Sequence, residues 1–437
     1  MKERLGYIKS FIFVFICAIG MNSCVYDSYS DDDGAGDVVD ENGLFLVLRI
    51  SPLSSNGGDN IGNRYEKIKS LRIIILSDGA IEVNEYIDKP EMSASGFNYI
   101  RQITAGKKDI YLIANENSVT GIKYYKDDDM SLPADLPTNL YDLLEKYSPN
   151  VEGSEAGADF ENVINSVYFS SPYNESEEQK NDVYLPYVSH YSDIQVKDNE
   201  TSDPIQMYLV PVATKFIFNF YNYRPATVNI NGISMKSVNE HNFLVPHVGE
   251  TDLKKTFNGE EYDWIEWLAK VSEASHNYTG FSDNVDFNDK YGWISDYEMP
   301  TPTIKKETVF VKGGNEEKYP VSKGINEDTP STLSLGPYYR PESRNLKETN
   351  LNTVEEDGDN EATNPNEQMY YLTLSLKDTA PGETPPEFTD VPISNLKALF
   401  RNTCVIINVT MRDGDVEVYT EIQDWNHKYA NGWVTEQ

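Results

Sequence analysis

The stretch from Gly43 to Tyr65 most constrains the fold of this chain, because an apolar strand is followed there by a long polar loop. Phe45 and Val47 lie on one face of the expected strand, and the other face is apolar too, so we expect cover on both faces, as in an inner strand of a sandwich. That other face consists of alternate aliphatic residues: Leu44, Leu46, Leu48 and Ile50.

The loop after this strand is rich in Ser, Asn, Gly and Asp and carries one basic residue, Arg64. This composition is typical of a flexible segment that a protease can reach. A single cut at Arg64 would separate a buried strand from its own domain.

The composition favours a β-rich secreted protein. The chain has 437 residues, enough for two or three domains. Aromatic residues make up 12%, with 30 Tyr, and Val, Ile and Thr recur in short runs. A formal net charge of -34 argues against binding to nucleic acid, whose phosphates demand a basic surface, and suits a solvated outer surface.

Residues 1–24 predict a lipoprotein signal peptide. Lys2 and Arg4 precede an apolar core, Phe11–Met21, that is too short to span a bilayer. The following Ser23 and Cys24 resemble the end of a bacterial lipobox, in which Cys24 becomes the acylated first residue. Ordinary signal cleavage nearby is the alternative.

Residues 25–42 predict an acidic tether. Six acids lie between Asp31 and Glu41, and the segment has too little apolar surface to fold. Ser30 to Asp33 also resembles the acidic signal that sends lipoproteins of Bacteroidales to the cell surface, and a plain solvated linker is the alternative.

The rest of the chain predicts two domains, 43–200 and 201–437, divided at the polar segment Lys197–Pro204. A short helix is expected over Thr138–Tyr147, a turn at Asp78-Gly79, and an exposed insertion loop over Pro341–Gln368. Strands are expected at Ile68–Ser77, Tyr99–Ile103, Asp109–Ala114, within Gln206–Tyr223, and at Thr227–Met235, Tyr370–Leu376, Thr403–Met411 and Val416–Trp425.

The sequence predicts no catalytic residues, no metal site and no cofactor. The histidines are scattered, and no zinc, nucleophile-elbow or phosphate-loop motif occurs. A hydrolase has only the abundance of carboxylates to support it. Cys404 lies in an apolar run and is expected to be a small buried residue. Two acidic clusters lack the glycine of a calcium loop and are interpreted as solvated charge: Asp283, Asp286 and Asp289, and Asp357, Asp359 and Glu361.

The last sixty residues contain a second informative strand, which expects burial on one side. Glu417, Tyr419 and Glu421 face the other way. The alternative is that this strand finishes its own sandwich. Its apolar or β-branched face consists of Val416, Val418, Thr420 and Ile422.

Taken in order, five features resemble the fimbrillins, which are subunits of the type V pili of Bacteroidales. They cover most of the chain, and each alone has low specificity. They are the lipobox at Cys24, the strand Gly43–Ile50 before a loop with Asn63-Arg64, the strand Lys67–Leu76, the run DIYLIANE at Asp109–Glu116, and the ending RNTCVIINVTM with VEVYTEIQDWN.

The resemblance implies an all-β lipoprotein with two tandem transthyretin-like β-sandwich domains and minor helical insertions. In that family an arginine-specific protease cuts the loop after the first strand, and a C-terminal strand of a neighbouring subunit fills the emptied groove. By position Arg64 matches the cleaved residue, whereas Arg49 lies within the strand and is protected until the strand unfolds.

We therefore expect a structural subunit of a cell-surface fimbria, of the stalk, accessory or tip type. Its partners would be other fimbrial subunits, an arginine-specific protease and, through its lipid, the outer membrane. One alternative is an anchor subunit that keeps its lipid. Another is a surface lipoprotein that binds glycans, for which Trp264 and Trp267 could stack on sugars, although core packing is the plainer interpretation.

Overall fold

All the strands and helices described belong to the unit Leu44–Gln437 of the computed structural model. The structure describes residues 44–52, 64–92, 96–124, 135–147, 149, 156–170, 183–197, 204–239, 241–245, 254–257, 260–263, 305–312, 319–326, 328–344, 370–378, 387–393, 398–399, 401–413 and 415–425. The expected signal peptide, tether and both acidic clusters lie outside these residues, as do Trp264 and Trp267. Among the residues described, none of the helices has the length and apolar character needed to cross a membrane.

The predicted all-β class is confirmed, with β-sandwich packing and minor helices. Seven strands form the N-terminal sheet in the order β3-β2-β5-β8-β9-β1-β4. They are β1 (Phe45–Pro52), β2 (Ser70–Ser77), β3 (Ala80–Asp88), β4 (Phe97–Gln102), β5 (Gly106–Ala114), β8 (Tyr187–Val196) and β9 (Ile205–Pro211).

This sheet folds over on itself to make a sandwich. β8 and β9 pair only at Tyr187 with Pro211 and at Val188 with Val210, so the ladder is narrow at that point. Side chains of β1, β4 and β9 share one apolar core with side chains of β2 and β5. The two parts of the sheet therefore pack against each other across this core.

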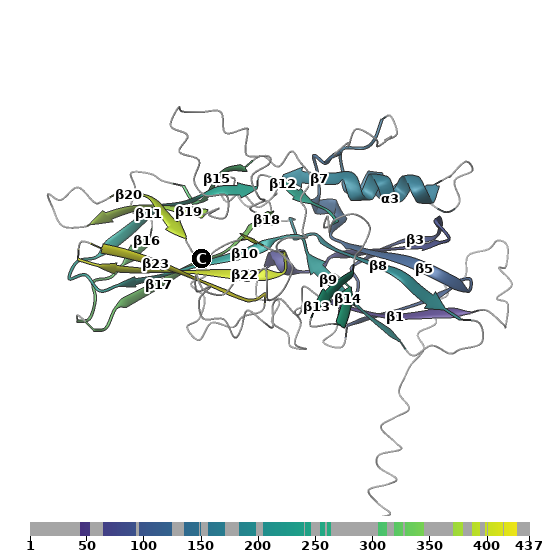
Figure 1. Ribbon diagram of the computed structural model, residues 1–437, viewed down its shortest axis with the longest axis horizontal. Coiled ribbons are helices and arrows are strands. Elements are labelled where there is room, and N and C mark those ends of the chain that lie inside the picture. Colours follow the sequence, from purple (N-terminus) through teal and green to yellow (C-terminus); the bar gives the residue numbers. More distant parts are fainter. Residues whose placement is uncertain are drawn as a thin grey trace, which may run out of the picture. The chain divides into compact units, whose positions relative to one another are not determined.

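β2 and β5 are buried on both faces, which explains their continuous apolar runs. Leu71 and Ile73 of β2 face the core shared with β1. Ile74 and Leu76 face a second core, formed with the helices α2 (Leu140–Glu145) and α3 (Ala156–Ser166). Figure 1 shows α3 and β1 on opposite sides of the layer that contains β3, β5 and β8.

Local sequence signals explain several of these elements. Asp78 and Gly79 have φ of 49° and 77°, the left-handed conformations that join β2 to β3 in a tight hairpin, as predicted. The predicted short helix is α2, whose first turn is capped where the Asn139 side chain accepts a bond from the backbone N–H of Asp142 at 2.8 Å. α3 was not predicted, although three of its residues repeat at helical spacing and are buried: Phe160, Val163 and Ile164.

The second half of the unit contains two further sheets around a separate apolar core. One has the order β17-β10-β22-β23, formed by β10 (Thr214–Asn222), β17 (Ser331–Arg340), β22 (Thr403–Arg412) and β23 (Asp415–Asp424). The other has the order β15-β11-β19-β20, with β16 also paired to β11, formed by β11 (Val228–Asn239), β15 (Lys305–Val311), β16 (Tyr319–Val321), β19 (Tyr370–Asp378) and β20 (Glu387–Ile393).

Shorter elements complete the described chain. A small sheet has the order β12-β7-β6, and two further pairs are β13 with β14 and β18 with β21. The bounds are η1 (Arg64–Glu66), η2 (Glu116–Ser118), β6 (Lys123–Tyr124), β7 (Val167–Ser170), β12 (His241–Phe243), β13 (Lys254–Phe257), β14 (Glu260–Asp263), β18 (Ser343–Arg344) and β21 (Ala398–Leu399).

The chain passes from the first sandwich to the second between β9 and β10. β9 pairs with β1, and β10 pairs with β17 and β22, so the apolar run Gln206–Tyr223 divides at Val212 and Ala213. β12 follows β11 in sequence but pairs with β7, back beside the first sandwich. The expected division of the chain at residue 200 stays a prediction.

The expectation that Pro341–Gln368 is an exposed loop is wrong at its first two residues, whereas the expected burial of Cys404 is confirmed. Pro341 and Glu342, which open the expected exposed insertion loop, are buried, because Glu342 forms an ion pair with the equally buried Arg401. Cys404 is buried in β22 as predicted, beside Ile217 and Ile406.

Candidate functional site

The first strand, β1, is inserted between two others. It runs antiparallel to β4, with Leu48 opposite Tyr99, and parallel to β9, with Ile50 opposite Met207. Both backbone edges of β1 are therefore used in the ladder. Its removal would leave β4 and β9 each with an unpaired edge.

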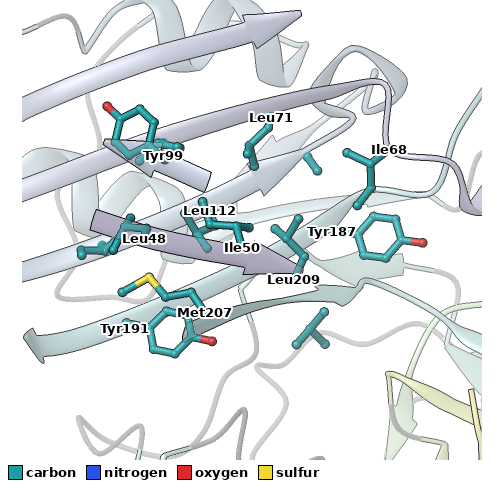
Figure 2. Packing of buried hydrophobic residues seen from close by; sticks show 14 of the residues in the cluster. Leu48, Ile50, Ile68, Leu71, Tyr99, Leu112, Tyr187, Tyr191, Met207 and Leu209 are labelled. Atoms are coloured by element: carbon teal, nitrogen blue, oxygen red, sulfur yellow. The ribbon is translucent and has the colours of Figure 1, made fainter. Parts of the chain in front are cut away.

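One face of β1 belongs to the core of the first sandwich. Leu46, Leu48 and Ile50 are 1%, 0% and 0% exposed. Figure 2 shows Leu48 and Ile50 among Leu112 of β5 and Leu209 of β9. Leu44, the fourth expected core residue, precedes β1 and is only half-buried, although it packs against the same cluster.

The other face of β1 is more open than the sequence predicts. Phe45 is 46% exposed, Arg49 is exposed and Val47 is half-buried. The expected cover on both faces is therefore wrong. The physical reason is that α2 and α3 pack on the far face of β2 and β5 and not on β1.

Gly96 allows the backbone before β4 to approach β1 closely. Its φ is +92°, and a Cβ atom at this position would lie 2.8 Å from the carbonyl oxygen of Ile50. A side chain here would therefore collide with the ladder and strain the backbone.

The next described element after β1 is η1, which begins at Arg64. Residues 53–63, most of the expected protease-accessible loop, lie outside the described residues. The residues next to Arg64 are firmly held, because the backbone oxygen of Tyr65 accepts a hydrogen bond from the N–H of Leu185 at 2.7 Å. Arg64 thus stands at the boundary between that loop and a fixed segment.

Glu66 is the buried anchor of η1, at 5% exposed. Its carboxylate lies 2.7 Å from the Nζ atom of Lys215 and accepts a hydrogen bond from the Tyr339 hydroxyl, also at 2.7 Å. Its backbone oxygen accepts a bond from the Tyr187 hydroxyl at 2.8 Å. Burial raises the pKa of Tyr187 and of Tyr339 well above the ordinary value, and the charge of Glu66 adds to both shifts.

Lys215 also holds the residue that follows the last described strand. Its Nζ atom donates a hydrogen bond to the backbone oxygen of Trp425 at 2.7 Å and lies 4.5 Å from the centre of the Trp425 ring. The Trp425 and Tyr339 rings have centroids 5.8 Å apart. We call Glu66, Lys215, Tyr339 and Trp425 the Lys215 cluster.

Asn115 fixes the chain just after η1. It has a left-handed φ of 60°, and its side-chain oxygen accepts a hydrogen bond from the N–H of Lys69 at 2.7 Å. Its side-chain nitrogen donates to the oxygens of Lys67 at 2.9 Å and Leu185 at 2.6 Å. The start of β2 is thereby held independently of β1.

The expected donor strand is β23, and the structure places it in its own sandwich. It forms an antiparallel hairpin with β22 through ten register pairs, among them Val405 with Ile422. Val416 and Val418 pack partly buried against the core of the second sandwich, and Thr420 is 1% exposed. Its assignment as a donor stays a prediction, and donation would require β23 to separate from β22.

The structure therefore brings together some of the expected site residues and not others. Leu46, Leu48 and Ile50 form one buried face, while the residues of β23 lie in the other sandwich. Cys24 lies outside the described residues.

The Lys215 cluster was not predicted; the one available signal was a lysine within the apolar run of β10. Within the described ranges, no three His, Cys, Asp or Glu side chains are grouped so as to hold a metal ion.

Comparison with known proteins gives structural neighbours only. No protein-family model matches the sequence, and no curated protein matches it. The structure is similar to the tip fimbrial protein Mfa3 from Porphyromonas gingivalis with a C-terminal truncation, with a TM-score of 0.43 and 13% identity over 87% of this chain and 99% of that one. It is also similar to a fimbrial assembly protein from Parabacteroides distasonis, with a TM-score of 0.38 and 9% identity over 87% of this chain and 98% of that one.

These neighbours are of the kind that the sequence resemblance predicts.

Proposed function

We propose that this chain is a structural subunit of a cell-surface fimbria, exported as an outer-membrane lipoprotein through Cys24 and activated by cleavage at Arg64. The single observation that supports the proposal is the placement of β1. It is an inserted strand that completes a core and is paired on both sides, yet it joins the remainder of the unit through a polar loop.

Once β1 is removed, a groove filled by another strand has a lower free energy than an empty groove. Leu46, Leu48 and Ile50 are each worth about 1.5–3 kcal/mol of apolar burial. Loss of β1 would expose the apolar residues that face it and leave the backbone edges of β4 and β9 unpaired. A strand with alternating apolar residues, supplied by a second subunit, restores both contributions. Assembly is thereby driven by the removal of β1.

The position of Arg64 suits such a cut. An arginine-specific protease reaches the polar loop, whereas Arg49 lies in the middle of the β1 ladder, opposite Asn98. Asn115 holds Lys67 and Lys69 on the other side of Arg64, so the remaining sandwich keeps β2 in place after the cut.

The test is limited digestion of the exported chain, residues 24–437, with a trace of arginine-specific protease, followed by intact-mass and N-terminal analysis and by gel electrophoresis in SDS without boiling. We expect a new N-terminus at Tyr65, loss of the β1 fragment and a ladder of SDS-resistant oligomers. The matched control is Arg64→Lys, which keeps the charge but is not a substrate. A synthetic peptide of residues 43–52, added in excess, should suppress the ladder.

Two outcomes oppose the proposal. If Arg64 resists cleavage in the folded chain, a lipid-retaining anchor subunit becomes the better assignment. If the chain is cut at Arg64, loses β1 and stays monomeric, strand exchange is excluded as the assembly mechanism.

A further inference from the structure

The Lys215 cluster joins two segments that the proposed function treats as separate. Glu66 belongs to η1, directly behind the expected cleavage position, and Trp425 directly follows β23, the expected donor strand. Lys215 binds both of them through one ammonium group, with its Nζ atom 2.7 Å from each oxygen. The segment behind the expected cleavage position and the segment that follows the expected donor strand therefore share one buried cation, Lys215.

This cation depends on its carboxylate. Lys215 and Glu66 are each 5% exposed. A buried ammonium that loses its counter-charge is strongly disfavoured, and the structure around it must open to water. β23, the strand that Trp425 follows, stands at the end of its sheet order and is paired there with β22 alone.

A cut after Arg64 acts directly on this arrangement. Before the cut, Tyr65 and Glu66 are tethered on both sides, by the loop to β1 and by the chain to β2. After it, Glu66 is the second residue of a new terminus, where chains fray. The new α-ammonium group of Tyr65 also competes with Lys215 for the adjacent carboxylate.

We propose that the Lys215 cluster is an autoinhibitory latch, which keeps Trp425 and β23 in their own sandwich while Glu66 is seated and releases them when η1 is disturbed. The role of the latch in assembly rests on the proposed function. The coupling between Glu66 and Trp425 does not, because it can be measured in the uncut, folded chain. The latch would keep the C-terminal strand from being offered before the first strand has been removed.

Hydrogen exchange measured by mass spectrometry on the full exported chain tests the latch without any protease. The variant Glu66→Gln keeps the shape of the side chain and removes its charge. We expect exchange in peptides covering Asp415–Trp425 to become about tenfold faster or more, because a buried cation has lost its partner. Peptides from β5, which lies in the first sandwich, should be accelerated less than peptides covering Asp415–Trp425.

The control is Glu116→Gln, which breaks another buried ion pair, between Glu116 and Arg72 at 2.7 Å, while Arg72 keeps Glu145 as a second partner at 2.6 Å. This variant should leave exchange over Asp415–Trp425 unchanged. Coupling is reciprocal, so Trp425→Ala should in turn speed exchange over residues 65–69. If Glu66→Gln does not fold, Tyr339→Phe removes one hydrogen bond to the same carboxylate and should give a smaller effect in the same peptides.

The latch is overturned if Glu66→Gln, or Tyr339→Phe in its place, leaves exchange over Asp415–Trp425 unchanged, or if Glu116→Gln accelerates it equally. A different result would show that the proposed function fails while the latch holds. A chain that resists cutting at Arg64 but shows the coupled exchange keeps the latch and loses the fimbrial processing step.

Discussion

The carboxylate of Glu66 lies 2.7 Å from the ammonium of Lys215, so the segment behind the first loop is bound to a strand of the second sandwich. We expect Glu66→Gln to lower the free energy of unfolding by about 3–5 kcal/mol, because it leaves a buried cation unpaired. Adding Lys215→Met to that variant should cost much less than Lys215→Met alone. Urea unfolding of the four proteins of this double-mutant cycle measures the coupling.

The exposed pair Lys107–Asp193, also in hydrogen-bond contact at 2.9 Å, is the control for that cycle. Both side chains are more than half exposed, so solvent and salt screen them, and we expect no measurable coupling. Additive effects at Glu66 and Lys215 would contradict the arrangement described above.

Leu48 provides a test of the core contribution of β1. Because its side chain is 0% exposed, Leu48→Ala should cost about 2–5 kcal/mol of unfolding free energy. Val47, its half-buried neighbour on the opposite face, is the matched control, and Val47→Ala should cost clearly less. Equal effects would mean that β1 is held by its backbone ladder and not by its apolar face.

Gly96 tests the close approach of the chain to β1. We expect Gly96→Ala to destabilise the protein by about 1–3 kcal/mol, since alanine combines an unfavourable positive φ with a collision against the Ile50 carbonyl. Gly121 also has a positive φ, of +66°, but a Cβ there meets nothing within 4 Å. Thermal unfolding should therefore separate Gly96→Ala from Gly121→Ala, which carries the conformational cost alone.

His190 makes stability depend on pH. Its ring stacks on Tyr111 with centroids 3.8 Å apart, and burial lowers its pKa from 6.5 to about 3. The unfolded chain takes up a proton near pH 6.5 that the folded chain refuses until about pH 3. The contribution is thus fully present above pH 6.5, and the free energy of unfolding falls by at most about 1.4 kcal/mol per pH unit below it.

The check for His190 is a comparison of urea unfolding at pH 7 and pH 5 for the wild type and for His190→Phe, which keeps a stacked ring without a titrating group. The variant should lose less stability between the two pH values. Identical losses of unfolding free energy in the two proteins would show that carboxylates alone cause the fall in stability between pH 7 and pH 5.

The sequence by itself determined the features that depend on neighbouring residues. The alternation of Leu46, Leu48 and Ile50 predicted a strand with a buried face, and Asp78-Gly79 predicted a hairpin, because strand period and turn conformation are local properties. The helical spacing of Leu140, Leu143 and Leu144 predicted α2 in the same way. α3 carries a comparable local signal in the spacing of Phe160, Val163 and Ile164.

Only the tertiary structure decided what lies against each face and which distant groups meet. Phe45 looked like a core residue, but the helices cover β2 and β5 instead, leaving it exposed. Lys215 and Trp425 are 210 residues apart in sequence, and no pattern near either one encodes their contact. The reason is physical: an ion pair or a ring contact is selected by the assembled core, whereas periodicity records only that a residue will be buried somewhere.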